Sequence, residues 1–197
     1  STCTVQARHW PAPQPNLVPV MLRLSRSTQS SGISAGASTL RFFPLIESSW
    51  EAEPPSLYGR FDFAYDGVNP PKLLEYNADT PTSLLEAAVI QWYWLQDCFP
   101  KRDQFNSLHE RLVALWKELG RYLPGRRIDL CSMDDAEDGM TVTYLQDTAQ
   151  QAGLTATIFP IDEVGWNGEY FVGPEDEHLG AVFKLYPWEW MVHEQFG

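Results

Sequence analysis

The sequence predicts an α/β protein in which helices flank a mixed sheet. The first observation is the order strand, helix, strand in residues 126–132 (RRIDLCS), 138–153 (DGMTVTYLQDTAQQAG) and 154–160 (LTATIFP). That order is typical of a βαβ unit, in which a crossover helix joins two parallel strands. The second observation is a hairpin in residues 60–77, where the alternating side chains of RFDFAY lead through the turn residues DGVNPP into KLLEYN. The hairpin adds antiparallel pairing, and we expect its first strand, RFDFAY, to be half-buried.

Two helices are expected between the hairpin and the βαβ unit. The first covers residues 80–97, with Pro81 in the first turn, where a helix tolerates proline, and Ser83 three residues before Glu86, the spacing of a capping box. The second covers residues 106–119, where leucine recurs with helical spacing before a glycine that can end the helix.

The C-terminal part predicts a second hairpin and a final strand. An Asn-Gly turn signal lies between apolar flanks in residues 165–172, and an apolar strand at residues 180–185 leads into an aromatic segment. We interpret Lys184, within that strand, as an edge or surface charge in preference to a nucleotide-binding lysine. The sequence contains neither GxGxxG nor GxxxxGK[ST], so it lacks both a dinucleotide fingerprint and a P-loop.

Residues 1–40 differ in composition from the rest of the chain. Several prolines precede the stretch SRSTQSSGISAGAS, which has no hydrophobic periodicity. We interpret residues 1–40 as a flexible or poorly defined arm and residues 41–197 as one folded domain.

Composition and charge restrict the classes of partner. The net charge of −12 over 197 residues argues against nucleic-acid binding, which depends on clustered lysine and arginine. It is compatible with a cationic partner such as a polyamine or a metal ion, or simply with solubility. No stretch approaches the roughly 18 apolar residues of a membrane helix. Cys3, Cys98 and Cys131 are too few and too far apart for a disulfide framework, so we expect a reducing, cytoplasmic setting.

The hairpin brings a set of polar side chains to one of its faces. If the chain folds about the middle of the loop at residues 66–71, positions whose numbers sum to 137 face each other. Because strand side chains alternate, one face then carries the polar residues and the other the large apolar ones. The expected pairs are Arg60 with Asn77, Asp62 with Glu75, and Ala64 with Leu73. The expected apolar face consists of Phe61, Phe63, Leu74 and Tyr76.

This polar face predicts a site for a cation and a phosphate. Asp62 and Glu75, directly across a ladder, repel each other unless a cation lies between them. Two carboxylates and the Asn77 amide oxygen are hard ligands that suit Mg²⁺, and Arg60 can hold a phosphate in bidentate fashion. The alternative is a solvated strand face on which Asp62 and Glu75 pair only with Arg60 or Lys72.

The junction after the hairpin carries an excess of hydroxyl groups. Thr80, Thr82 and Ser83 surround a predicted helix start, where free backbone N–H groups attract anions. Helix capping accounts for one of these hydroxyl groups but not for all three beside Asp79. The junction therefore favours an anion-binding role in addition to capping.

Four stretches carry a resemblance to a known family. SLYGRFDFAYDG, PKLLEYNADTPTSLLEAAVIQWYWLQD, TVTYLQDTAQQAG and FKLYPWEWM resemble the glutathionylspermidine synthase family over roughly residues 44–197. The resemblance implies a pre-ATP-grasp region that leads into an ATP-grasp domain. It also implies an ATP- and Mg²⁺-dependent ligase that joins the glycine carboxylate of a glutathione-like peptide to a polyamine through an acyl phosphate.

The resemblance also implies roles for individual residues. Arg60 would be the catalytic contact to the transferred phosphate and the activated carboxylate, and Arg60 and Asp62 would lie at the ATP phosphates. The implied magnesium ligands are Asp62, Glu75 and Asn77. The implied substrate-binding residues are Thr80 and Thr82 near the peptide, and Glu137 and Asp138 near the peptide or the amine.

The resemblance departs from the family pattern at both ends of the chain. No amidase region precedes it, and the ATP-grasp segments that follow PWEWM in the family are missing, so we expect a domain truncated before the full ATP-grasp portion. A truncated, non-catalytic remnant that binds only a metal or a peptide is therefore the alternative to a ligase. A hydrolase using Asp62 and Glu75 is disfavoured, because directly paired strand residues lie too close for an inverting pair.

Overall fold

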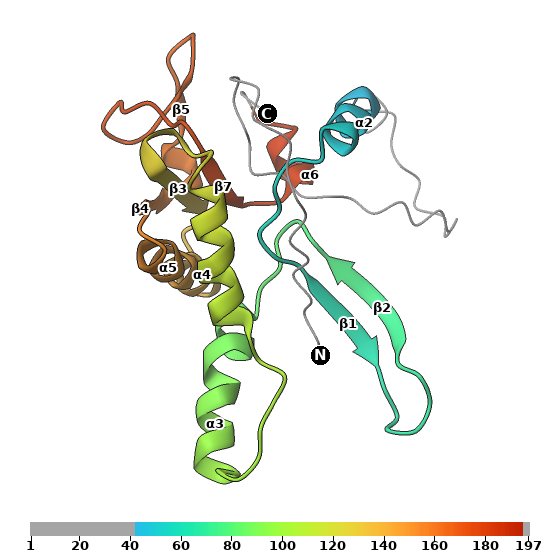
Figure 1. The fold of residues 1–197 in the computed structure, drawn as a ribbon. Coiled ribbons are helices and arrows are strands. Elements are labelled where there is room, and N and C mark those ends of the chain that lie inside the picture. Colours follow the sequence, from blue (N-terminus) through green and yellow to red (C-terminus); the bar gives the residue numbers. More distant parts are fainter. Residues whose placement is uncertain (1–41, 195–197) are drawn as a thin grey trace.

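The computed structural model describes residues 42–194. The arm expected at residues 1–40 lies outside the described residues. The α/β class is confirmed, since helices pack on parallel strands and two antiparallel hairpins complete the fold (Figure 1). Parallel and antiparallel pairing lie in separate sheets.

The central sheet has three parallel strands in the order β4-β3-β7. Strand β3 spans Arg127–Ser132, β4 spans Thr155–Pro160 and β7 spans Val182–Leu185. Helix α5, Ala136–Gln151, connects β3 to β4 and packs on both. This arrangement confirms the predicted βαβ unit, and it adds the predicted C-terminal strand to the other edge of β3.

The main core lies between this sheet and helices α4 and α5. Helix α4, Leu108–Leu119, begins close to the predicted start and packs against α5. Its leucine periodicity gives it one buried face, and this face joins the same core cluster as the buried side chains of α5 and the sheet. The largest fully buried core side chains are Trp116, Leu112, Ile128, Leu130, Leu145, Leu185 and Val142.

The first hairpin consists of β1, Arg60–Ala64, and β2, Lys72–Asn77. Its antiparallel register confirms the predicted pairs Arg60 with Asn77 and Asp62 with Glu75. The third predicted pair is wrong: after Asp62 the register shifts by one residue, so that Phe63 pairs with Leu73 and Ala64 with Lys72. The shift leaves Leu74 as an extra residue on β2, which is a β-bulge.

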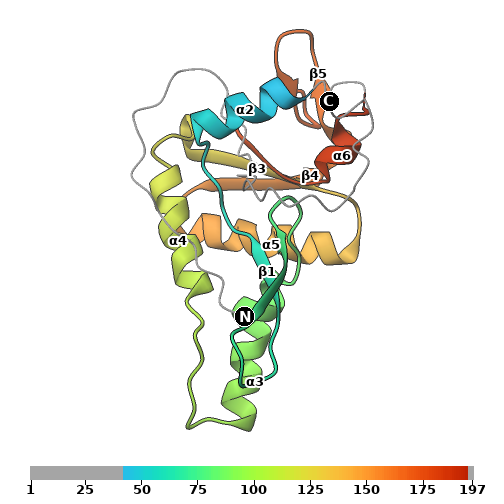
Figure 2. The same cartoon turned by 90° about the vertical axis from the view of Figure 1, so that its right-hand side faces the viewer.

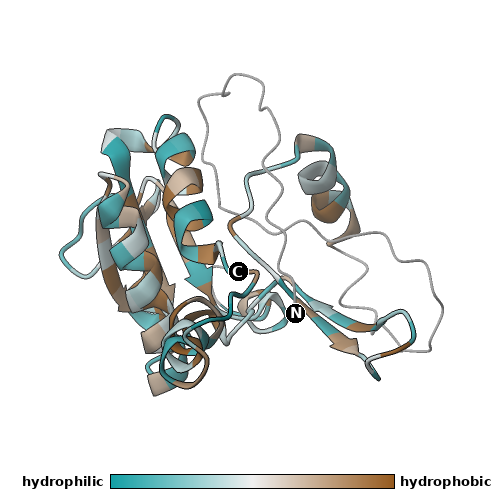
Figure 3. Ribbon diagram, turned by 60° about the horizontal axis from the view of Figure 1, so that its bottom comes forward, coloured by the Kyte–Doolittle hydropathy of each residue, from teal (hydrophilic) through white to brown (hydrophobic). Residues whose placement is uncertain are grey.

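The hairpin extends away from the central sheet (Figure 2). On its apolar face, Phe61 stacks on Tyr76 with ring centroids 4.2 Å apart and lies beside Phe63. The expectation of a half-buried first strand holds for Arg60 to Asp62, which are partly buried, but not for the end of the strand, where Phe63 is 42% exposed. On the partner strand, Leu74 is 69% exposed. Figure 3 shows hydrophobic colour within the hairpin, although it stands clear of the packed helices.

The helix after the hairpin begins later than predicted. Helical structure starts at Leu84 instead of Thr80, and it continues through a π-helical turn, η1 (Glu86–Ile90), into α3 (Gln91–Cys98). Pro81 lies before the helix, and Ser83 has a φ of 63° in the left-handed region. A π-turn widens the helix and displaces carbonyl groups from their usual partners. The Asn106 side chain fills this gap, because its Nδ2 donates to the carbonyl groups of Ala87 and Ala88.

Replacing Asn106 with alanine should lower the free energy of unfolding by about 1–3 kcal/mol, since two partly buried carbonyl groups lose their donor. Urea denaturation followed by circular dichroism measures this loss. Asn69→Ala, at the exposed tip of the first hairpin, is the matched control and should change stability by less than about 0.5 kcal/mol. Equal effects of the two substitutions would contradict the role assigned to Asn106.

The remaining elements are short. The second hairpin is confirmed, with β5 and β6 joined by a turn in which Gly168 has a φ of 99°. Within residues 42–194, no helix combines the length and apolar character needed to cross a membrane. The other elements are α2 (Phe43–Ala52), η2 (Pro124–Arg126), η3 (Ile161–Glu163), β5 (Gly165–Trp166), β6 (Phe171–Val172) and α6 (Trp188–Met191).

Candidate phosphate and metal site

Arg60 is the centre of the candidate site. Its Nε lies 3.0 Å from Asp62 Oδ1 and its Nη2 lies 3.1 Å from Asp62 Oδ2, which makes a bidentate ion pair. Its remaining terminal nitrogen, Nη1, donates to Thr82 Oγ1 over 3.3 Å. The guanidinium is thus held in one orientation by a strand neighbour and by the junction after β2, and it remains about one-third exposed.

The opposite strand adds further polar groups to this face. The hairpin register places Glu75 across from Asp62 and Asn77 across from Arg60. The pKa of Arg60 is raised, first by its hydrogen bond to Asp62 and then by the charges of Asp62, Glu75 and Glu137, while burial opposes the rise. The site therefore combines one fixed cation with an excess of negative charge.

The oxygen atoms of Asp62, Glu75 and Asn77 are of the kind that bind a hard cation such as Mg²⁺. Asp62 and Glu75 supply carboxylate oxygens and Asn77 an amide oxygen, and a carboxylate can accept a ligand in addition to Arg60 because it has about four lone-pair sites. In residues 42–194 no group of three or more His, Cys, Asp and Glu residues is arranged to hold a metal, so any bound Mg²⁺ would need the Asn77 amide, water or phosphate as well.

Glu137 and Asp138 lie at the start of α5. Asp135 caps this helix, since its Oδ1 accepts hydrogen bonds from the backbone N–H groups of Glu137 and Asp138, both 2.9 Å away. Burial, and then the neighbouring charges of Asp135 and Glu137, raise the pKa of Asp138. The charge of Glu137 acts on Arg60, which relates this acidic turn to the hairpin face.

The structure separates the two predicted threonines. Thr82 contacts Arg60, whereas Thr80 lies half-buried in the same junction without a described contact to Arg60. Between them, the Pro81 carbonyl accepts a hydrogen bond of 2.6 Å from the Tyr58 hydroxyl. Tyr58 thus helps to fix the junction from the segment that precedes β1.

Lys184 lies on β7, an edge strand of the central sheet, as one form of the interpretation expected, but it is not a surface charge. Lys184 is only 8% exposed, and its Nζ lies 2.7 Å from Asp79 Oδ1. The sequence reasoning missed this contact because its two partners are 105 positions apart. The large apolar neighbours Phe183 and Leu185 were the available signal that the strand is buried on both faces.

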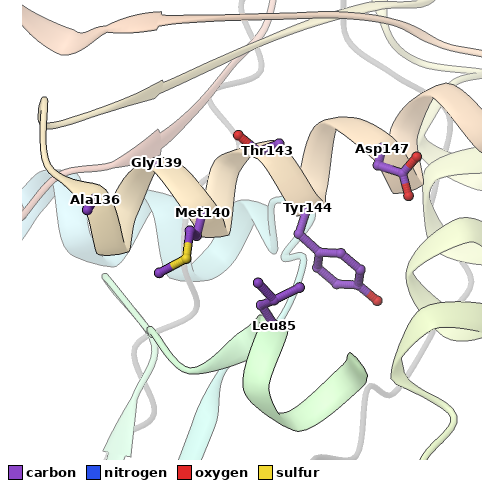
Figure 4. Close-up of a pocket in the computed structure, with 7 residues that line it drawn as sticks. All are labelled: Leu85, Ala136, Gly139, Met140, Thr143, Tyr144 and Asp147. Carbon is purple, nitrogen blue, oxygen red and sulfur yellow. The ribbon is translucent and has the colours of Figure 1, made fainter. Parts of the chain in front are cut away.

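A separate cavity of about 520 Å³ lies between α5 and Leu85, at the start of the helix that contains η1 and α3 (Figure 4). Its wall is mostly apolar, and none of the predicted site residues lines it. The cavity is therefore not part of the candidate site on the hairpin face. The lining residues are Leu85, Ala136, Gly139, Met140, Thr143, Tyr144 and Asp147.

Comparison with known proteins identifies the family. A family model described as glutathionylspermidine synthase preATP-grasp matches residues 31–197. The chain therefore belongs to the glutathionylspermidine synthase family, and its described part is the pre-ATP-grasp fold of that family. The resemblance predicted from the sequence is confirmed.

Individual relatives are named as a ligase or as synthetases. A putative acid–amine ligase of Haemophilus influenzae is 47% identical over 158 residues, which cover 77% of this chain and 40% of that protein. Trypanothione synthetase of Crithidia fasciculata is 28% identical, over 78% of this chain and 24% of that protein. The bifunctional glutathionylspermidine synthetase/amidase of Escherichia coli is 28% identical, over 75% of this chain and 24% of its own length. The chain thus spans less than half the length of these relatives.

Proposed function

We propose that residues 60–82 form the magnesium- and phosphate-binding face of an ATP-dependent carboxylate-amine ligase. The observation that carries the proposal is the orientation of Arg60, which is held by Asp62 and Thr82 on the face where Glu75 and Asn77 lie opposite. One cation among hard oxygen donors suits a phosphoryl group accompanied by a divalent metal. The ligase names of the relatives support the same reaction class.

The proposed reaction has two steps. A peptide carboxylate oxygen attacks the γ-phosphorus of ATP and ADP leaves, after which an amine nitrogen attacks the acyl carbon, phosphate leaves and the amine loses a proton. Arg60 would offset the repulsion between the carboxylate and the phosphate and stabilise charge in the transition state. Mg²⁺ held by Asp62, Glu75 and Asn77 would supply charge neutralisation at the phosphate oxygens.

The substrates proposed are a glutathione-like peptide and a polyamine. Thr82 offers a hydroxyl group beside Arg60, and Thr80 a second one in the same junction, for the peptide. Glu137, whose charge acts on Arg60, and its neighbour Asp138 are the proposed acidic contacts for the peptide or the amine. The excess of acidic residues over the whole chain, with a net charge of −12, favours approach of a polycation.

Isothermal titration calorimetry of the full chain tests the phosphate and metal face. A non-hydrolysable ATP analogue should bind in the presence of Mg²⁺ and bind much more weakly in its absence. Glu75→Gln should reduce the Mg²⁺-dependent affinity by about 10–100-fold, since it replaces a charged oxygen donor by an amide of the same shape. Release of ADP that requires both glutathione and spermidine would extend the result from binding to ligation.

Asp66→Asn is the matched control for Glu75→Gln. It makes the same change from carboxylate to amide on the same hairpin, but at the exposed tip, where Asp66 accepts hydrogen bonds from Val68 and Asn69. Its affinity should equal that of the unmodified chain. The proposed ligase face would be contradicted if the nucleotide did not bind, or if its affinity were the same without Mg²⁺ and in Glu75→Gln. Either result would favour the non-catalytic alternative.

A further inference from the structure

Asp79 joins the junction after β2 to a distant segment of the chain. Its Oδ1 accepts a hydrogen bond of 2.7 Å from Lys184 Nζ, and its Oδ2 accepts one of 2.9 Å from the backbone N–H of Trp188. We call these two contacts the Asp79 bridge. Both oxygens of one carboxylate therefore hold the segment where β7 ends and α6 begins.

The Lys184 end of the bridge is rigid. Lys184 Nζ also donates to the Tyr186 carbonyl over 2.7 Å, and it lies 4.1 Å from the centre of the Trp188 ring. A buried ammonium group is tolerated only when it is paired and hydrogen-bonded. Because Lys184 sits in the central sheet beside β3, the bridge fixes Asp79 relative to the main core of the protein.

The junction, residues 79–83, contains a strained backbone conformation that contacts from other parts of the chain must hold in place. Thr82, which orients Arg60, lies three residues after Asp79, and the next residue, Ser83, has a φ of 63°. A non-glycine residue in this left-handed region costs free energy and persists only where surrounding contacts enforce it. The Tyr58 hydroxyl holds one point of the junction, at Pro81, and Asp79 holds another.

We propose that Asp79 is a positioning residue for the candidate site: through Lys184 and Trp188 it fixes the junction that places Thr82 against Arg60. This inference rests on the proposed function, because the purpose of the fixed junction is to orient Arg60 toward a phosphate. The proposed metal ligands stay Asp62, Glu75 and Asn77, and Asp79 acts on the site only through its contacts to Lys184 and Trp188.

The test compares Asp79→Asn with Asp66→Asn in the full chain. Both variants replace a carboxylate by an amide, but only the first changes the Asp79 bridge. The Nε–H resonance of Arg60, assigned in the nitrogen-15 NMR spectrum through its loss in Arg60→Lys, reports the orientation of the guanidinium. We expect Asp79→Asn to shift or broaden this resonance and to weaken Mg²⁺-dependent binding of the ATP analogue by about tenfold or more, as loss of a ligand-orienting partner does. Asp66→Asn should change neither.

Two further variants keep the test decisive if Asp79→Asn does not fold. Lys184→Gln removes the charge at the other end of the bridge, so it should also change the Arg60 resonance and weaken Mg²⁺-dependent binding. Lys184→Arg retains the charge, so its Arg60 resonance and its affinity should stay close to those of the unmodified chain. A loss of thermal stability in Asp79→Asn or Lys184→Gln without any change in the Arg60 resonance would overturn the positioning role and leave a structural one.

The two proposals fail in different ways. If the unmodified chain shows no Mg²⁺-dependent nucleotide binding, the proposed function fails, and the positioning role for that function falls with it. If the unmodified chain binds the nucleotide and Asp79→Asn binds it equally well, only the inference about Asp79 is overturned.

Discussion

Replacing Trp116 with alanine should lower the free energy of unfolding by about 3–5 kcal/mol, the range measured when large buried aromatic side chains are truncated. Trp116 is fully buried between α4 and α5, and its Nε1 donates to Thr148 Oγ1 over 3.1 Å. The substitution leaves a cavity in the main core and removes the donor of a buried hydroxyl group. Since domains are stable by only about 5–15 kcal/mol, the loss is a large fraction of the total. Chemical denaturation followed by circular dichroism measures it.

Two further variants serve as controls for Trp116→Ala. Trp116→Phe keeps most of the volume but loses the hydrogen bond to Thr148, so its destabilisation should be smaller, and it supplies a folded protein if the alanine variant does not fold. Trp94→Ala, at a position that is 57% exposed, should change stability by less than about 1 kcal/mol. Equal losses at Trp94 and Trp116 would show that the α4–α5 core is not the main source of stability.

The sequence was sufficient to predict elements whose signals are local. The βαβ unit follows from hydrophobic periodicity and short connections, and the hairpin pairing of Asp62 with Glu75 follows from turn residues and alternation. The bulge was missed because a simple fold about the loop assumes even spacing along both strands. The adjacent apolar residues Leu73 and Leu74 break the alternation, and they were the available sign of an extra residue.

Features that depend on distant partners were not predictable in the same way. The helix begins at Leu84, directly after Ser83, which is the start that the Ser83–Glu86 spacing of a capping box indicates. The proline signal at Pro81 placed the predicted start too early, because the Pro81 carbonyl instead accepts a hydrogen bond from the distant Tyr58 hydroxyl. The carbonyl groups of Ala87 and Ala88 in the π-turn accept hydrogen bonds from Asn106, a residue outside the helix that contains the turn. The burial of Lys184 depends on Asp79, 105 positions earlier. No local pattern specifies such pairs.

The candidate site shows the same division. The residue types and their strand face were predicted from the sequence, and the observed register supports them. The orientation of Arg60 was not, because it depends on Thr82, 22 positions away. The position of Thr82 depends in turn on contacts that reach the end of β7. The local sequence thus predicts which functional groups the candidate site contains, whereas contacts between distant parts of the chain determine how those groups are oriented.

Replacing Arg60 with methionine should reduce the rate of ADP formation in the presence of glutathione and spermidine by about 10²–10³-fold, the loss found when one preorganised electrostatic donor is removed. Steady-state kinetics should show the loss mainly in kcat, because the proposed contact strengthens as charge develops on the phosphate. Arg60→Lys should recover only part of the rate, since an ammonium group keeps the charge but cannot make the bidentate contacts that orient the guanidinium.

Arg102→Met is the matched control for Arg60→Met. Arg102 lies over the ring of Phe99 at the end of α3, outside the hairpin face, so its loss should leave kcat and KM unchanged. Arg60 also holds Asp62 and Thr82, and its removal leaves the opposed pair Asp62 and Glu75 without the ion pair from Arg60 to Asp62. Additional Mg²⁺ should therefore not restore the rate of Arg60→Met, because the metal replaces the charge but not the contact to Thr82. A rate for Arg60→Met equal to that of Arg102→Met would remove Arg60 from the proposed chemistry, and recovery at high Mg²⁺ would reduce its role to charge compensation.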